Sequence, residues 1–326
     1  MRITPNMINK ELRVAAFVAR LLMQPWPWYI RMIAALSMRA RGSPIKGVQC
    51  EEVWIPRFGE GSRIRTRIYK PLGSIERLPV LLYLHGGGYF MGTPESFALI
   101  IRKFIETRHC IVIAPDYRKS LKAPYPAAID DCYETLVWIK NNSEMLGARP
   151  DQIMVGGHSA GGGLTAALTL RARDRGEVNI AFQMPIYPMI DDRMTTESAR
   201  DNNAPLWNSK LNEMAWHFYL SELKRRNQPI PYDAAAARAS DYSNLPPTMT
   251  SVGDLEPFRD ETIAYVENLK KAGVPVEFEI FKGCFHGFDM VAPNASVSKE
   301  ATQFTMKCFA NAIDGFFAPQ TELPRR

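Results

Sequence analysis

From about residue 48 onward, short runs of apolar residues alternate with longer segments in which apolar and polar residues follow a helical period. Each short run is bounded by Gly, Pro or Asp, as fully buried central strands usually are. The short runs predict strands at Val48–Ile55, Ile64–Tyr69, Pro79–Leu84, Cys110–Ala114, Ile153–Val155, Ile180–Pro185, Thr248–Val252 and Val276–Phe281. The helical period predicts helices near Phe97–Thr107, Ala127–Asn141, Gly161–Asp174, Asp260–Ala272 and Ser298–Phe317. This alternation predicts an α/β fold with a mostly parallel, eight-stranded sheet and helices on both faces.

Two segments do not follow this alternation. Residues 1–47 have a helical pattern interrupted by Pro25 and Pro27, and residues 190–245 form an insertion between two strands. Ligands of open α/β folds bind at the carboxyl edge of the sheet, so both segments are candidates for a lid there. Packing against the body is the alternative for the aromatic residues of the insertion. We therefore expect an N-terminal helical cap segment, residues 1–47, and a main α/β domain, residues 48–326, with a cap insertion at about 190–245.

The chain has 326 residues, of which 46% are hydrophobic, and it carries a formal net charge of +6. The charge is uneven, because residues 1–50 hold eight basic side chains and one acid, Glu11, whereas the remaining residues sum to −1. Since the main domain shows no basic stretch, we expect no nucleic-acid partner. A solvated helical face is the simplest interpretation of the basic segment, and contact with an anionic lipid surface or an acidic substrate is the alternative.

The cysteines suggest a reducing compartment. There are five, an odd number, widely spaced and without a CxxC motif or a Cys/His cluster, as expected for reduced thiols in a cytoplasm. No run of 18 apolar residues predicts a membrane span. The apolar stretch from Val14 to Met23 is interrupted by Arg20 and lacks a clean small-residue cleavage site, which disfavours a secretory signal. We expect a cytoplasmic chain that needs no metal or cofactor.

A nucleophile motif lies in the middle of the chain. Gly157-His158-Ser159-Ala160-Gly161 follows a predicted strand and opens a predicted helix, which is the context that the G-x-S-x-G elbow requires. A serine on such an elbow adopts strained backbone angles, and flanking glycines remove Cβ atoms that would collide there. Its hydroxyl projects toward a substrate while the helix N-terminus offers positive potential to a developing oxyanion. Ser159 is therefore the predicted nucleophile.

A glycine-rich loop supplies the second part of the predicted site. His85-Gly86-Gly87-Gly88 directly follows the strand predicted at Val80–Leu84. Consecutive glycines let backbone N–H groups approach a carbonyl oxygen, so Gly86 and Gly87, together with the N–H of Ala160, form the predicted oxyanion hole. A phosphate-binding loop is the competing interpretation, but no Gly-Lys-Ser/Thr follows. His85 belongs to the loop and is expected to form structural hydrogen bonds.

Together these two motifs resemble the hormone-sensitive-lipase-like branch, bacterial family IV, of the α/β-hydrolase superfamily. The resemblance spans about residues 48–317 and includes Asp116-Tyr117-Arg118, Tyr125–Asp131, Glu256–Glu261 and His286-Gly287-Phe288. It implies the α/β-hydrolase fold, with residues 48–326 as the catalytic domain and the N-terminal segment as part of the cap. The chain departs from the family at Lys119-Ser120-Leu121-Lys122, where the family usually continues Leu-Ala-Pro-Glu.

The resemblance also implies the remaining catalytic residues. In α/β hydrolases the nucleophile, the acid and the histidine follow in that order along the chain, and His286, in a loop after the last predicted strand, is the histidine placed accordingly. Two carboxylates, Asp254 and Glu256, follow the strand predicted at Thr248–Val252, and either could reach the imidazole. The family's Asp-Pro-Leu-Arg-Asp aligns with residues 256–260, which makes Glu256 the expected acid and Asp254 the alternative.

The resemblance implies a serine carboxylesterase that hydrolyses short- to medium-chain esters through an acyl-enzyme, without a cofactor or metal. An amidase or arylformamidase uses the same machinery, and a hydrolase-like hormone receptor is the alternative from another class. Such receptors lack the catalytic histidine, whereas this chain has His286. The family often forms dimers through the last strand, so a homodimer is a further expectation. Candidates for lining the substrate pocket are four tryptophans, Trp26, Trp28, Trp207 and Trp216, although packing explains them equally well.

Overall fold

The computed structural model describes residues 1–39, 45–73 and 76–320. Its centre is one eight-stranded sheet in the order β1-β2-β4-β3-β5-β6-β7-β8. The strands are β1 (Val48–Pro56), β2 (Arg63–Pro71), β3 (Leu78–Leu84), β4 (Ile111–Pro115), β5 (Ala148–His158), β6 (Phe182–Ile186), β7 (Thr248–Gly253) and β8 (Val276–Phe281). Strand β2 is antiparallel to β1 and β4, and all other neighbours are parallel. The predicted fold class, a mostly parallel sheet of eight strands, is confirmed.

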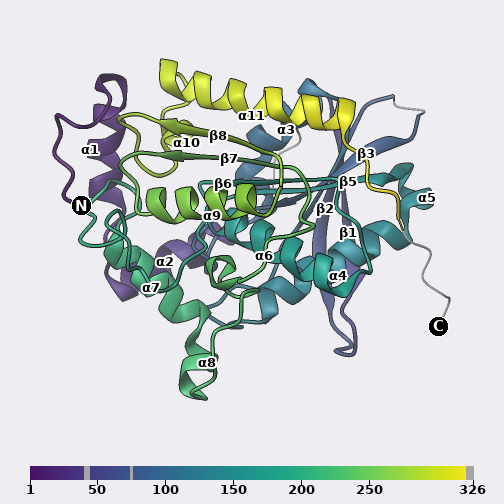
Figure 1. Ribbon diagram of the computed structural model, residues 1–326, viewed down its shortest axis with the longest axis horizontal. Helices are drawn as coiled ribbons and strands as arrows, with labels where there is room; N and C mark the ends of the chain where they lie inside the picture. Colours follow the sequence, from purple (N-terminus) through teal and green to yellow (C-terminus); the bar gives the residue numbers. More distant parts are fainter. Residues whose placement is uncertain (40–44, 74–75, 321–326) are drawn as a thin grey trace.

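Helices cover both faces of the sheet (Figure 1), with α3 and α11 on one face and α4, α6 and α9 on the other. The α-helices are α1 (Arg13–Leu22), α2 (Pro27–Ser37), α3 (Ala98–Thr107), α4 (Ala127–Asn141), α5 (Ser143–Leu146), α6 (Ala160–Arg175), α7 (Ser209–Tyr219), α8 (Ser221–Arg225), α9 (Arg259–Lys271), α10 (Phe288–Val291) and α11 (Ser296–Gly315). Short 3-10 helices span Lys10–Leu12, Pro94–Phe97 and Ala236–Arg238.

Because helices cover both faces of the sheet, the central strands are apolar throughout. Every residue of β3, β4 and β6 is buried, because a strand with helices on both faces has no solvated side. Helix α6 is also buried along most of its length, from Ala160 to Ala172, and its many Gly, Ala and Thr residues let it pack closely. The sheet and α6 therefore form a rigid base for the loops at the carboxyl ends of the strands.

The N-terminal segment packs against the loop that follows β8. Leu12 and Ala16 belong to an apolar cluster with Leu255 and Phe285, and the backbone N–H of Asn9 donates to the carbonyl of Gly283 at 2.9 Å. Helix α2 is tied to the loop after β3, because Ser37 Oγ accepts from the N–H of Gly92 at 3.1 Å. Residues 40–44 of the predicted cap segment lie outside the described residues.

The insertion after β6 contains α7 and α8. Trp216 and Tyr219 of α7 are buried against Tyr89, with the Tyr219 and Tyr89 rings stacked at a centroid distance of 4.1 Å. Trp207 precedes the helix and is not part of it. In the part of the chain that the structure describes, no helix is both long enough and apolar enough to cross a membrane.

Candidate active site

Ser159 lies at the sharp turn between β5 and α6. Its backbone angles are φ 60° and ψ −121°, in a region that L-residues rarely adopt. The turn runs close to the end of β3, since a Cβ on Gly161 would lie 2.0 Å from the carbonyl oxygen of Leu84. Only a glycine fits there, and the sequence motif thus reflects a steric requirement of the elbow.

His286 and Glu256 lie beside this serine. The Nε2 atom of His286 is 2.8 Å from Ser159 Oγ, and its Nδ1 atom is 2.5 Å from Oε2 of Glu256. Glu256 is completely buried, and its other oxygen accepts from the backbone N–H of Gly253 at 2.6 Å. The structure therefore brings the three predicted residues into one hydrogen-bonded chain, which is the geometry of an activated nucleophile.

Asp254, the alternative acid, faces away from the imidazole. Its Oδ1 atom accepts from the backbone N–H groups of Gly283 at 2.7 Å and Cys284 at 3.3 Å. These contacts hold the loop after β7 against the loop after β8. Burial raises the pKa of the Asp254 carboxyl. The geometry gives Asp254 a structural place and leaves Glu256 in contact with the histidine.

Two aromatic rings hold the imidazole of His286. The rings of Tyr187 and Phe258 meet it edge-on, each at a centroid distance of 4.9 Å. The hydroxyl of Tyr187 donates to Asp289 at 3.1 Å, and burial raises the pKa of Asp289 to about 6. No signal in the sequence indicates Tyr187 or Asp289, which follow β6 and lie in α10 respectively, and Phe258 falls within the Glu256–Glu261 segment without a predicted role of its own.

The glycine-rich loop runs alongside the elbow. A Cβ on Gly86 would lie 2.9 Å from the carbonyl of His158, and one on Gly87, whose φ is 122°, would lie 2.2 Å from the carbonyl of Met91. Within the described chain, the backbone N–H groups of Gly86, Gly87 and Ala160 have no hydrogen-bond acceptor. Three unpaired donors beside the hydroxyl of Ser159 can stabilise a negatively charged oxygen.

His85 orients the glycine-rich loop through a hydrogen bond to its backbone. Burial lowers its pKa to about 3, so the ring is neutral and its Nδ1–H donates to the carbonyl of Gly86 at 2.8 Å. Because a trans peptide holds C=O and N–H on opposite sides, this bond fixes the direction of the Gly87 N–H. The ring of Tyr117 stacks on the imidazole of His85 at a centroid distance of 4.2 Å. The Tyr117 hydroxyl donates to the backbone carbonyl of His85 at 2.7 Å.

The segment that departs from the family pattern supports Tyr117. The ammonium group of Lys119 is buried, lies 4.2 Å from the centre of the Tyr117 ring and pairs with Asp116 at 2.9 Å. Burial lowers the pKa of Lys119, an effect that the neighbouring Asp116 opposes. The backbone N–H of Ser120 also donates to the carbonyl of Tyr89 at 2.9 Å. Residues 119–120 therefore pack behind the glycine-rich loop.

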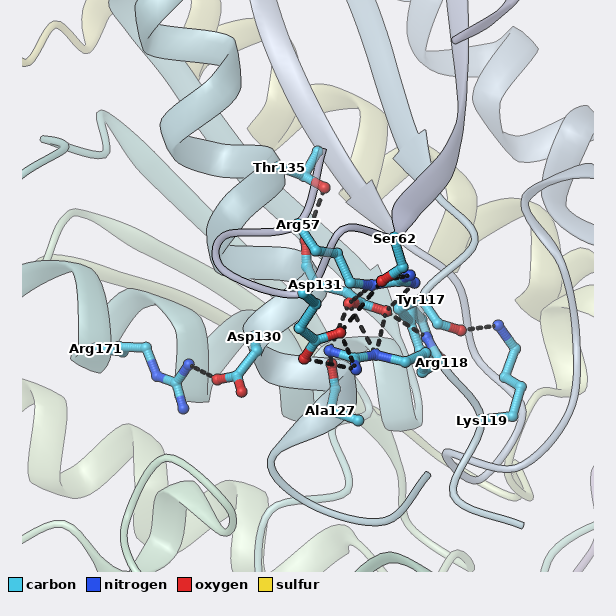
Figure 2. Close-up of polar contacts among 11 residues, drawn as sticks. Arg57, Ser62, Tyr117, Arg118, Lys119, Ala127, Asp130, Asp131, Thr135 and Arg171 are labelled. Carbon is cyan, nitrogen blue, oxygen red and sulfur yellow. Dashed lines mark hydrogen bonds and ion pairs between the residues drawn. The ribbon is translucent and has the colours of Figure 1, made fainter. Parts of the chain in front are cut away.

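A buried ion-pair cluster anchors the start of the same segment (Figure 2). The guanidinium groups of Arg57 and Arg118 both lie beside Oδ1 of Asp131, with N···O distances of 2.8 and 2.9 Å. The Asp131 carboxylate also accepts from the backbone N–H of Arg118 at 2.8 Å. Asp131 has no exposed surface. The cluster joins the β1–β2 hairpin, the loop after β4 and helix α4, so it holds the base of the loop that carries Tyr117.

An apolar cavity of about 220 Å³ opens onto Ser159 and His286. Segments that are far apart in the sequence line it, with Met23 following α1, Leu206 and Trp207 in the insertion, and Met290 and Val291 in α10. Trp216 is buried elsewhere, and Trp26 and Trp28 are exposed, so Trp207 alone among the four candidate tryptophans lines this cavity. Among the described residues, no group of His, Cys, Asp and Glu is arranged to hold a metal ion.

The other histidines do not reach the serine hydroxyl. His158 is buried with its Nδ1 atom 2.7 Å from the hydroxyl of Tyr83, and burial lowers its pKa to about 3. His109 and His217 are exposed on the surface. His286 is therefore the histidine placed to exchange a proton with Ser159.

The order of these groups along the chain, serine first and histidine last, on a mostly parallel sheet, is that of the α/β hydrolases. The family model described as alpha/beta hydrolase fold matches residues 81–290, and the chain belongs to this family.

Proteins similar to this chain are named as esterases. Esterase LipI of Mycobacterium tuberculosis is 34% identical over 275 residues, which cover 83% of this chain and 85% of LipI. Carboxylesterase NlhH of the same organism is 32% identical over 240 residues, which cover 73% of this chain and 75% of NlhH. A solved structure of a bacterial heroin esterase superposes with a TM-score of 0.86 at 33% identity, covering 95% of this chain and 99% of that protein. The resemblance to the hormone-sensitive-lipase-like branch is confirmed.

Proposed function

We propose that this chain is a serine carboxylesterase and that Ser159, His286 and Glu256 are its catalytic triad. The observation that carries the proposal is the hydrogen-bonded chain from Ser159 Oγ through both nitrogens of His286 to Glu256. The curated relatives, named esterase and carboxylesterase, support the same class of reaction.

In the first half of the reaction, Ser159 Oγ attacks the ester carbonyl while Nε2 of His286 takes the hydroxyl proton. The carboxylate of Glu256 accepts from Nδ1–H, which fixes the imidazole tautomer and stabilises the imidazolium. His286 then passes its proton to the leaving alcohol, and an acyl-enzyme remains. In the second half, a water molecule attacks the acyl group by the reverse proton transfers and releases the acid.

The oxyanion of each tetrahedral intermediate is stabilised by the backbone N–H groups of Gly86, Gly87 and Ala160. These donors are held in place before the substrate binds, Gly87 through the bond from His85 to Gly86 and Ala160 as the first residue of α6. Preorganised donors need no reorganisation when the charge develops, which is why they accelerate the reaction.

The substrates are short- to medium-chain carboxylic esters. The cavity beside Ser159 is lined almost entirely by apolar atoms, which suits an alkyl or aryl group and offers no charged partner for an ionised substrate. Its volume of about 220 Å³ limits the length of the acyl chain that it encloses. The five cysteines are all unpaired, which supports a cytoplasmic location for this reaction.

The test is a series of p-nitrophenyl esters from acetate to laurate. The wild-type enzyme should turn over acetate and butyrate and lose activity at the long end of the series, and Ser159→Ala should lower kcat by roughly 10⁵-fold or more. Ser243→Ala, a serine outside the cavity, is the control and should be unchanged. Near-normal turnover by Ser159→Ala would refute the mechanism, and faster cleavage of a matched amide would favour an amidase. Saturable binding of a ligand without a burst of product would favour a receptor.

A further inference from the structure

Helix α1 has its large apolar side chains on the outside. Val14, Phe17 and Leu21 recur at helical spacing and are 77%, 66% and 61% exposed. Val18 and Leu22 lie next to them and are also exposed. A surface helix normally turns its large apolar residues toward the core, but the buried residues of α1 are the small Ala16 and Ala19. This inversion leaves an apolar stripe without a partner in the described chain.

The start of α2 extends the stripe. Trp26 and Trp28 are both exposed, with their indole rings stacked at a centroid distance of 6.2 Å. The hydroxyl of Tyr29 donates to the carbonyl of Leu22, which joins this turn to the end of α1. Tryptophan and tyrosine favour the boundary between hydrocarbon and water, because each combines an apolar ring with a polar group. We call Val14, Phe17, Val18, Leu21, Leu22, Trp26 and Trp28 the apolar face.

The charges around the apolar face are basic. Residues 1–39 carry six basic side chains, Arg2, Lys10, Arg13, Arg20, Arg31 and Arg39, and in the described structure none forms an ion pair with a carboxylate. Glu11 is the single acid of this segment, and it accepts from the backbone N–H of Ser296 at 2.7 Å. The positive charge of the segment is therefore available to an anionic partner.

The apolar face adjoins, along the chain, a residue of the active-site cavity. Met23, directly after Leu22, lines the cavity that opens onto Ser159. Helix α1 lies at one end of the molecule (Figure 1), and its inner side is fixed because Ala16, together with Leu12 just before the helix, packs with Phe285 in the loop that carries His286. A surface bound to α1 would therefore lie close to the entrance of the cavity.

We propose that the apolar face is a docking surface for an anionic lipid bilayer, in which Phe17, Leu21 and the tryptophans enter the acyl boundary and the arginines contact phosphate headgroups. Exposed apolar residues, interfacial aromatic residues and basic residues without a carboxylate partner together characterise helices that lie in such an interface. A second copy of the chain fits less well, because a twofold contact sets a patch against itself and would bring like charges together. The proposal does not depend on ester hydrolysis.

The first experiment measures sedimentation with vesicles of phosphatidylcholine alone and of equal parts phosphatidylcholine and phosphatidylglycerol. The full-length protein should bind the anionic vesicles, and Phe17→Ser/Leu21→Ser should weaken that binding by roughly tenfold or more. The matched control is Phe58→Ser/Leu99→Ser, which removes two apolar side chains, exposed by 64% and 76%, outside the apolar face. The control should bind as the wild type does, and all three proteins should keep their activity on a soluble ester.

The second experiment separates charge from apolar contact and from self-association. Arg13→Gln/Arg31→Gln should weaken binding to the anionic vesicles and reduce its salt dependence. The proposal would be overturned if the wild type bound neither vesicle. It would also be overturned if Phe17→Ser/Leu21→Ser and its control lost vesicle binding equally. A third contradicting outcome is a dimer, seen by analytical ultracentrifugation, that Phe17→Ser/Leu21→Ser dissociates while vesicle binding is absent.

Discussion

The carboxylate of Glu256 lies 2.5 Å from Nδ1 of His286, whereas Asp254, two residues earlier in the same loop, bonds to backbone N–H groups of the next loop. A difference of two positions thus separates a residue that acts on the imidazole from one that holds the loops together. The two carboxylates should respond differently to substitution.

We expect Glu256→Gln to lower kcat by about 10³- to 10⁴-fold, because an amide no longer fixes the tautomer or stabilises the imidazolium. Asp254→Asn should change kcat only a few-fold and lower the melting temperature instead. Steady-state kinetics with p-nitrophenyl butyrate and a thermal melt distinguish the two effects. A larger loss of kcat in Asp254→Asn would overturn the assignment of the acid.

Gly87→Ala tests the oxyanion loop. The new Cβ would lie 2.2 Å from a backbone oxygen at a φ of 122°, so the loop must shift. Displacing a donor there should lower kcat by about 10²- to 10³-fold with little change in KM. Gly315→Ala is the control, because nothing lies within 4 Å of its added Cβ. Equal activity of the two variants would argue against this loop as the source of donors.

The buried carboxyl of Asp289 should make stability depend on pH. Its pKa is raised from 3.8 to about 6 in the folded protein, so the folded state binds the proton more tightly than the unfolded state. Stability from this group is fully present below about pH 4 and is lost as pH rises toward 6. Asp289→Asn should therefore become more stable relative to wild type over that interval, by at most about 3 kcal/mol. Urea unfolding of both proteins at pH 4, 5, 6 and 7 measures the difference, and a constant difference would contradict the prediction.

Asp131→Ala removes the centre of the buried ion-pair cluster shown in Figure 2. Arg57 and Arg118 would lose a fully buried counter-charge, which should reduce the free energy of unfolding by about 3–5 kcal/mol. Asp314→Ala breaks an exposed pair with Arg108 and should have little effect. Chemical denaturation measures the free energy of unfolding of both variants. Similar losses of that free energy would show that burial of the ion pair does not determine its contribution to stability.

The sequence predicts the sheet well because parallel strands are buried on both faces and read as apolar runs. The prediction fails at strand ends. Strand β5 is predicted from Ile153 to Val155 but spans Ala148–His158, since Arg149, Pro150 and Asp151 at its start are partly exposed and carry no apolar signal. Strand β6 begins at Phe182, where pairing with Met154 of β5 begins, and not at Ile180.

Within the site, the sequence finds the residues that belong to motifs with a mechanical reason. Gly161 is fixed by its close approach to β3, and Ser159 and Gly87 by backbone angles that few residues adopt. The cavity wall is different. Met23, Leu206 and Met290 come from three distant segments, and no local pattern shows that they meet. For the same reason, no local pattern distinguishes Trp207, which lines the cavity, from Trp26 and Trp28, which do not.

The strained angles at Ser159 also have an evolutionary consequence. A non-glycine residue in such a conformation costs about 1–3 kcal/mol, and a glycine there would relieve much of that cost. At this one position, stability and the proposed nucleophile therefore make opposite demands on the chain. Selection for stability alone would favour glycine at position 159, whereas selection for the proposed activity would favour serine.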